Sequence, residues 1–236
     1  TKVVCPYAFW GMGRTVARTF RVEHGTAARS PLVPLSLTPV LYAAAARADA
    51  ESPDDARPSD LLQQALSELV GPAALTRVTS WRAWRSAVKS GHPQLLVVLG
   101  HTETAGGEMT IEIGEESRLA RPDVSTAVLR GKVGPPPLVV LLACASAAAG
   151  DTFGGLPAAF TGRGAAAVVA TLSKLKGPHG ASAAAAVIRA LRESTTDGGV
   201  TLGRALTTAR RRLIADGVLV GLLLVAHGEI DLLVTT

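Results

Sequence analysis

A histidine and a cysteine each follow directly after a run of apolar residues, and this pair of side chains could perform nucleophilic catalysis. His101 comes after LLVVLG, residues 95–100, and Cys144 comes after LVVLLA, residues 138–143. The thiolate is the reactive form of cysteine, and a nearby imidazole can generate it and later protonate a leaving amine. The sequence therefore predicts Cys144 as the attacking group and His101 as the residue that moves the proton.

The two apolar runs are predicted to be neighbouring strands in the centre of a parallel sheet. Both runs are continuous rather than alternating, which is typical of strands buried on both faces. Catalytic groups gather beyond the carboxyl ends of such strands, so this arrangement would bring the imidazole and the thiol to one cleft. Taken alone, a cysteine at an alanine-rich strand end is more often a small buried hydrophobe, and a histidine there is commonly structural. Their joint placement favours catalysis.

Strands and helices are predicted to alternate along the chain, which indicates an α/β sandwich of about six mostly parallel strands with helices on both faces. Further strands are expected at residues 39–45, 77–79, 165–172 and 219–226, and helices at residues 59–70, 81–89, 156–161, 182–193 and 201–215. Residues 109–113 alternate apolar and polar positions and predict an exposed hairpin outside the core. Residues 1–35 are expected to form an N-terminal extension that packs on a main domain of residues 36–236.

The composition restricts the classes of function. Hydrophobic residues make up 47% of the 236 residues and charged residues 18%, as in a folded chain. No apolar stretch reaches the roughly 20 residues of a membrane-spanning helix, so no membrane partner is expected. The formal net charge is +5, but the basic residues are scattered and aromatics make up only 4%, which disfavours specific nucleic-acid binding.

The cysteine content predicts a reducing, cytoplasmic location. Cys5 and Cys144 are too few for a disulfide framework, and no Cys or His cluster has metal-ligand spacing, so neither a metal site nor a cofactor is expected. The chain begins with Thr1 and carries no signal-peptide pattern. We therefore expect it to be a piece of a longer multidomain protein.

Four segments, taken in order, resemble a known family. They are LLVVLGHTE at residues 95–103, LVVLLACASA at 138–147, GLPAAFTGRGAAAVVATL at 155–172 and LGRALTTARRRL at 202–213. Together they are similar to CHAT domains, caspase-like cysteine peptidases of clan CD, over about residues 36–236. The resemblance implies a caspase-like three-layer sandwich with a dyad of His101 and Cys144, and backbone N–H groups of Cys144 and Thr102 as oxyanion donors. It also implies a bacterial effector module that cleaves a protein substrate under the control of a regulatory domain or partner protein.

Charged residues near the predicted strand ends indicate the charge of the substrate residue that the site would recognise. Caspase-like folds line the pocket for P1, the substrate residue before the scissile bond, at positions that match Arg47, Lys174 and Lys176, so an acidic or polar P1 residue is expected. Asp151 is the opposing candidate for recognition of a basic P1 residue. The chain departs from the caspase pattern at Thr102, which replaces the usual glycine after the catalytic histidine.

Two other functions stay open. A catalytically silent CHAT-like module would bind a partner protein and keep the fold without the chemistry. A nucleotide or other small-ligand domain could use the same crevice, but it would need a phosphate-binding loop. Gly11-Met12-Gly13 is not followed by a glycine at the third position of the G-x-G-x-x-G pattern, so this alternative lacks its motif.

Overall fold

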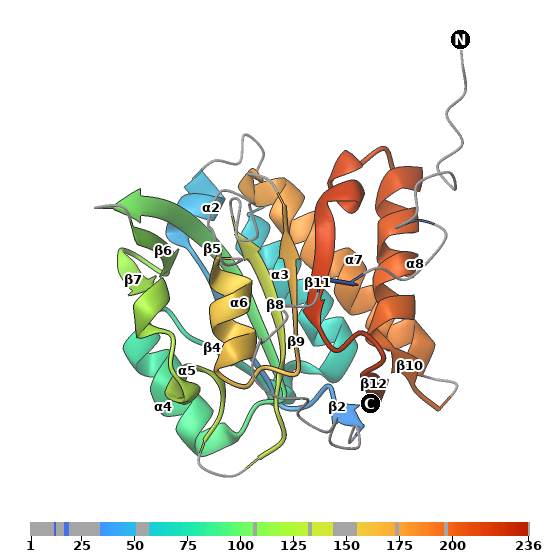
Figure 1. Ribbon diagram of the computed structural model, residues 1–236. Helices are drawn as coiled ribbons and strands as arrows, with labels where there is room; N and C mark the ends of the chain where they lie inside the picture. Colours follow the sequence, from blue (N-terminus) through green and yellow to red (C-terminus); the bar gives the residue numbers. More distant parts are fainter. Residues whose placement is uncertain are drawn as a thin grey trace.

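A central sheet between two layers of helices forms the structure (Figure 1). This computed structural model describes Met12 and residues 17–18, 34–50, 57–105, 108–131, 134–143, 155–172, 175–195 and 198–235. The predicted α/β sandwich with a mostly parallel sheet is confirmed. Among the described residues, no helix combines the length and the apolar character needed to cross a membrane.

The central sheet has the strand order β1-β11-β9-β8-β5-β3-β4. Its strands are β1 (Ala17–Arg18), β3 (Val40–Ala44), β4 (Leu75–Arg77), β5 (Leu95–Ala105), β8 (Leu138–Ala143), β9 (Ala167–Thr171) and β11 (Leu224–Gly228). Neighbouring strands from β4 to β9 are parallel, whereas β11 runs antiparallel to β9 and pairs in parallel with β1. The carboxyl ends of β3, β5, β8 and β9 therefore meet at one edge of the sheet.

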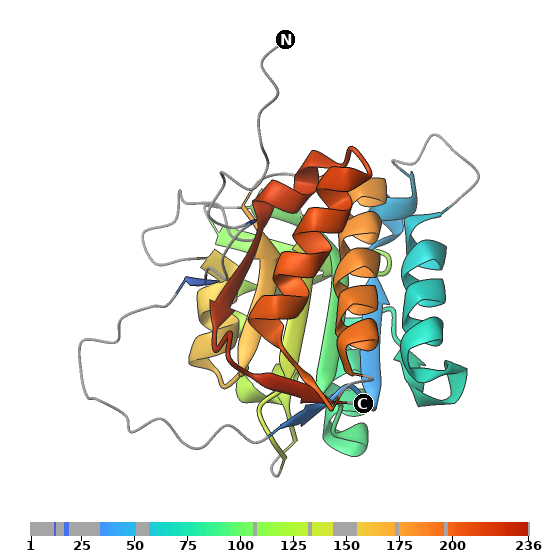
Figure 2. The same ribbon diagram turned by 90° about the vertical axis from the view of Figure 1, so that its right-hand side faces the viewer.

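The two faces of the sheet are covered by different helices. One face carries α2 (Ala46–Ala50), α3 (Pro58–Val70), α7 (Gly177–Thr195) and α8 (Leu202–Ala215), and the other carries α4 (Trp81–Gly91), α5 (Thr126–Leu129) and α6 (Gly155–Gly162). Figure 2 shows α3, α7 and α8 side by side in one layer. Buried side chains alternate along each strand, as the pleat requires, so that Leu95 and Val97 face the first layer and Leu96 and Val98 face the second. Each strand is therefore apolar on both faces.

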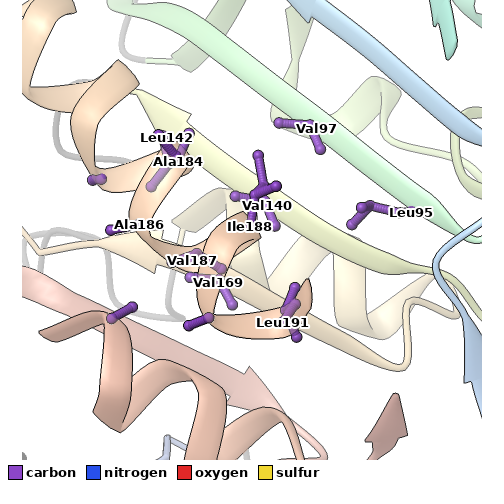
Figure 3. Close-up of a cluster of buried hydrophobic side chains, with 14 of the residues drawn as sticks. Leu95, Val97, Val140, Leu142, Val169, Ala184, Ala186, Val187, Ile188 and Leu191 are labelled. Carbon is purple, nitrogen blue, oxygen red and sulfur yellow. The ribbon is translucent and has the colours of Figure 1, made fainter. Parts of the chain in front are cut away.

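The core beneath α7 explains why the alanine-rich helix sits where it does. Val140 and Leu142 of β8 contact a cluster that includes Ala184, Val187 and Ile188 of α7 (Figure 3). Small alanine side chains let the helix lie close to the sheet, while the branched residues fill the space between. This packing buries the middle of α7 and fixes where its N-terminal end lies relative to β5 and β8.

The segment predicted as an exposed hairpin is part of the core, so that prediction is wrong. β5 continues past Gly100 and pairs antiparallel with β6 (Glu108–Ile113), which pairs in turn with β7 (Ser117–Ala120). Ile111 and Ile113 are fully buried. The reason is tertiary: α4 covers this face of the hairpin, and Nε1 of Trp81 donates a hydrogen bond of 3.1 Å to the carbonyl oxygen of Ile111.

Several predicted boundaries differ from the structure. The strand predicted at residues 219–226 begins only at Leu224, because residues 219–223 form the 3-10 helix η4 (Leu219–Leu223), in which Leu219 is 70% exposed. The strand predicted at 77–79 is β4, which ends at Arg77. α3 begins one residue earlier than predicted, with Pro58 in its first turn, and α7 begins at Gly177 rather than at Ser182. A small second sheet, β10 (Val200–Thr201), β12 (Leu233–Thr235) and β2 (Leu35–Ser36), was not predicted.

The burial of β5 predicts a clear difference between two identical substitutions. Leu95→Ala removes a fully buried side chain, and we expect it to lower the free energy of unfolding by about 3 kcal/mol, or the melting temperature by about 6–12 °C. Leu61→Ala on α3 removes a side chain that is 38% exposed, and we expect it to change stability by at most about 0.5 kcal/mol. Thermal unfolding followed by circular dichroism measures both. Equal losses would contradict the place of Leu95 in the core.

Candidate active site

The candidate site lies where the chain changes direction across the sheet. β4 pairs with one side of β3, whereas β5 pairs with the other, and the connecting helices α3 and α4 lie on opposite faces. Ligands of such sheets bind in the crevice outside the carboxyl ends of the strands at this switch point. A small cleft that opens to solvent lies here, lined by residues of β5 and β8, by Ala48 of α2 and by the start of α7.

His101 lies in the lining of this cleft and is half-buried. The parallel register of β5 and β8 places Gly100 opposite Ala143, so the residues just before the predicted dyad lie side by side. Ala143 also lines the cleft and is the last described residue of β8. Cys144, which follows it in the sequence, lies outside the described residues. His101 itself does not end its strand, since β5 continues to Ala105 in the hairpin with β6.

The structure describes three of the other predicted site residues. Lys176 is exposed and lines the cleft together with His101. Thr102 is half-buried in β5 opposite Ile111. Arg47 follows β3 in α2, as expected, and forms an ion pair described below. The predicted positions Lys174 and Asp151 lie outside the described residues.

Two functional candidates were missed by the sequence analysis, Glu112 and Arg118. In the ladders of β5, β6 and β7, His101 lies opposite Glu112, and Glu112 lies opposite Arg118, which places the three side chains in one row on the same face. Only 3% of the Glu112 side chain is exposed. Its two carboxylate oxygens bind different arginines: Oε1 lies 3.5 Å from Nε of Arg47, and Oε2 accepts a hydrogen bond of 3.2 Å from Nε of Arg118.

Arg118 also contacts Glu103, which lies two residues after His101 in β5. Its Nη2 lies 3.2 Å from Oε2 of Glu103. The hydrogen bond to Glu112, together with the charge of Glu103, raises the pKa of Arg118 above its ordinary value. Arg47 of α2 and three residues of β5, β6 and β7 thus form a row of alternating charges beside the histidine, in the order Arg47, Glu112, Arg118 and Glu103. Within the described part of the chain, no group of three or more His, Cys, Asp or Glu residues could hold a metal ion.

A sequence signal for this row existed. Gly106-Gly107 is a dipeptide typical of two-residue hairpin turns, and counting outward from it pairs His101 with Glu112. The observed pairing of Ala105 with Glu108 has this register. The signal was missed because the segment was expected to be exposed. A charged side chain in an exposed hairpin is normally solvated and does not indicate a functional site.

The N-terminal end of α7 forms the wall of the cleft that faces α2 and β5. An added Cβ at Gly177 would overlap the carbonyl oxygen of Ala48, and one at Gly180 would lie 2.9 Å from Cδ1 of Leu99. Only glycine allows the approach to backbone at Gly177, whereas at Gly180 the end of the Leu99 side chain would have to shift. In α7, Pro178 has no N–H and the N–H of Gly180 donates to the carbonyl oxygen of Lys176. The partial positive charge of a helix N-terminus and the charge of Lys176 still favour negative charge in the cleft.

Comparison with protein families decides the relationship. The family model for the CHAT domain matches residues 36–219. The chain belongs to the CHAT domain family. Comparison with the curated proteins finds no match to the sequence.

Solved structures with similar folds agree with the CHAT assignment. The CHAT chain is similar to the Arg-specific cysteine proteinase gingipain R, with a TM-score of 0.59 and 13% identity over 82% of this chain and 46% of that chain. It is also similar to a chain in the complex of the pro- and mature domains of RgpB from Porphyromonas gingivalis, with a TM-score of 0.57 and 13% identity over 84% of this chain and 48% of that chain. For the Saccharomyces cerevisiae separase–securin complex, the TM-score is 0.52 and the identity is 16% over 86% of this chain and 12% of that chain.

These similarities establish a caspase-like fold for the CHAT chain. At such low identity they show the fold alone. The chain spans less than half the length of the gingipain chain and about an eighth of the separase chain, with coverages of 46% and 12%.

The close approach of α7 predicts opposite outcomes for two glycine substitutions. Gly177→Ala forces α7 away from Ala48, and we expect a loss of about 1–3 kcal/mol of stability, as for other overpacked contacts. Gly162→Ala, at the end of α6, meets no atom within 4 Å and should leave stability unchanged or slightly higher. Chemical denaturation in urea measures both variants. A Gly177→Ala variant as stable as Gly162→Ala would show that α7 and α2 do not approach each other this closely.

Proposed function

We propose that this CHAT domain is a cysteine endopeptidase in which Cys144 is the nucleophile and His101 is the general acid and base. The observation that carries the proposal is the level register of β5 and β8, with Gly100 opposite Ala143 at the cleft. A peptide bond keeps the Cα atom of Cys144 about 3.8 Å from that of Ala143, and neighbouring strands lie about 4.8 Å apart. We therefore expect the thiol to lie within reach of the half-buried imidazole of His101.

The proposed reaction proceeds in two stages. The Cys144 thiolate attacks the carbonyl carbon of the scissile peptide bond, and the C–N bond breaks as His101 gives a proton to the leaving amine. The product of this stage is a thioester between Cys144 and the acyl part of the substrate. Water then attacks the thioester while His101 accepts its proton, and the C–S bond breaks to release a carboxylic acid and the thiolate.

Backbone N–H groups are the proposed stabilisers of the oxyanion. The resemblance to CHAT domains assigns this role to Cys144 and Thr102, the residues at and beside the dyad. Donors placed where negative charge develops lower the barrier because they need no rearrangement during the reaction. The side chain of Thr102 makes this donor more constrained than the usual glycine.

Positive charge around the cleft supports a preference for an acidic or polar P1 residue. Lys176 lines the cleft, and Arg47 extends from the neighbouring helix α2. Lys174 joins them in the proposal on its sequence position, and Asp151 is the opposing candidate that would select a basic residue. The arginine specificity of gingipain R belongs to that protein.

The proposal includes regulation by a further domain or a partner protein, in the cytoplasm of a bacterium. The family resemblance and the scarcity of cysteines support this part. The substrate would be a protein, and no cofactor takes part in the reaction.

Covalent labelling tests the dyad directly. We expect a peptidyl acyloxymethyl ketone to form one thioether, at Cys144, with loss of its carboxylate leaving group. His101→Ala should slow this labelling by about 10²- to 10⁴-fold, because the imidazole no longer generates the thiolate. Intact mass and peptide mapping measure the rate and the position.

The matched control is Cys5→Ala, which should label like the unchanged chain. Slow labelling of both cysteines that does not depend on His101 would contradict the proposed peptidase. That result would favour the catalytically silent module instead.

A peptide library tests the preference at P1. We expect cleavage, or labelling by a matched set of electrophiles, to be fastest with Asp, Glu or another polar residue at P1. Cleavage only after basic or apolar residues would overturn this part of the proposal and, in the basic case, favour Asp151.

A further inference from the structure

A buried carboxylate beside the candidate histidine has no role in the mechanism above. Among the described residues, Glu112 is the one acidic side chain that is buried. Burial of an unpaired charge is costly, and two arginines compensate for it here. A sheet position next to a cleft does not require this arrangement for stability, since an apolar side chain would pack there without any partner.

Glu112 forms no hydrogen bond or ion pair with His101 in the described part of the chain. The two residues lie opposite each other in the β5–β6 ladder, but in the described part of the chain the ion pairs of Glu112 are with Arg47 and Arg118. Each carboxylate oxygen faces a different guanidinium. The polar contacts of Glu112 therefore lead to the two arginines.

Arg47 is the arginine that can carry this effect. Its side chain is 47% exposed, whereas the Glu112 side chain that it meets is buried. The contact is at Nε, on the inner side of the guanidinium, at 3.5 Å from Oε1. A guanidinium held at this nitrogen still has two terminal nitrogens, and they match the two oxygens of a carboxylate. The next residue, Ala48, lines the cleft with His101.

We propose that Glu112 is a positioning residue that holds Arg47 at the rim of the cleft, where its guanidinium binds the carboxylate of an acidic substrate residue. This inference rests on the proposed peptidase function and names the residue on which its acidic preference depends. Lys176 and the N-terminal end of α7, which line the cleft, strengthen the preference. Arg118 has a different role, because it binds the other carboxylate oxygen of Glu112 and also contacts Glu103.

The separate roles of Glu112 and its neighbours can be distinguished by experiment. We compare aspartyl and asparaginyl acyloxymethyl ketones, which differ only by charge at P1, and take the ratio of their rates of Cys144 labelling. Glu112→Gln keeps the shape but releases Arg47, and we expect it to lower this ratio about tenfold, the effect of one charge-assisted pair. Labelling by the asparaginyl compound should change little. A fold that is merely damaged would slow both compounds equally.

Three further variants define the mechanism. Arg47→Met should lower the ratio as far as Glu112→Gln, and the double variant should lower it no further, because both changes remove one binding unit. Arg118→Met is the matched control, since it removes the other partner of Glu112 and leaves the Arg47 pair, and should keep the ratio. An unchanged ratio in Glu112→Gln, or an equal loss in Arg118→Met, would overturn the inference.

A binding measurement separates this inference from the proposed chemistry. In NMR spectra of arginine Nε–H groups, we expect N-acetyl-aspartate amide to shift the Arg47 signal in the unchanged chain but not in Glu112→Gln, and N-acetyl-asparagine amide to shift neither. This result together with no labelling of Cys144 that depends on His101 would reject the peptidase and keep the anion site. Labelling that depends on His101 without any response of Arg47 to the aspartyl compound would reject the anion site and keep the peptidase.

Discussion

The parallel pairing of β5 and β8 is the constraint on which the rest of the structure depends. Both strands are apolar on each face, so a shift of register by one residue would exchange the side chains that face the two helical layers. The packing on both faces therefore fixes the alignment of Gly100 with Ala143. This alignment sets which residues of each strand lie at the cleft. The positions of the helices that follow the strands depend on it.

The cleft combines two kinds of interaction with different tolerances. Apolar packing and the glycine contact at Gly177 determine the shape of its walls, and they leave little room for change. In our proposal, charged groups near it, Arg47 with Glu112 and the nearby Lys176, determine which charge it attracts. A change of specificity could therefore arise from the rim alone while the fold is kept. Such a separation suits a family that carries one scaffold into many proteins.

The sequence predicted the central strands and most helices because their signals are local. Continuous apolar runs and helical periodicity identify an element without knowledge of its neighbours. The burial of the hairpin could not be found in this way, since it depends on Trp81 from another part of the chain. For the same reason, Glu112 was missed: its importance comes from pairing across strands and from Arg47, which is far away in the sequence. Of the predicted site, His101 and Lys176 lie together at the cleft, while Cys144 stays a prediction from sequence.

The continuity of β5 has a mechanical consequence. Its first half, Leu95 to Gly100, is clamped between β3 and β8, and its second half, from His101 to Ala105, is one arm of the hairpin with β6. His101 is thus the first residue of β5 that pairs with β6 rather than with β3 or β8. The hairpin is itself anchored, because Gly114 exchanges backbone hydrogen bonds of 2.8 Å with Ala44 and Ala46 and Trp81 binds the carbonyl of Ile111. The orientation of the imidazole is therefore coupled to the position of the hairpin as a whole, together with the end of β3 and the start of α4.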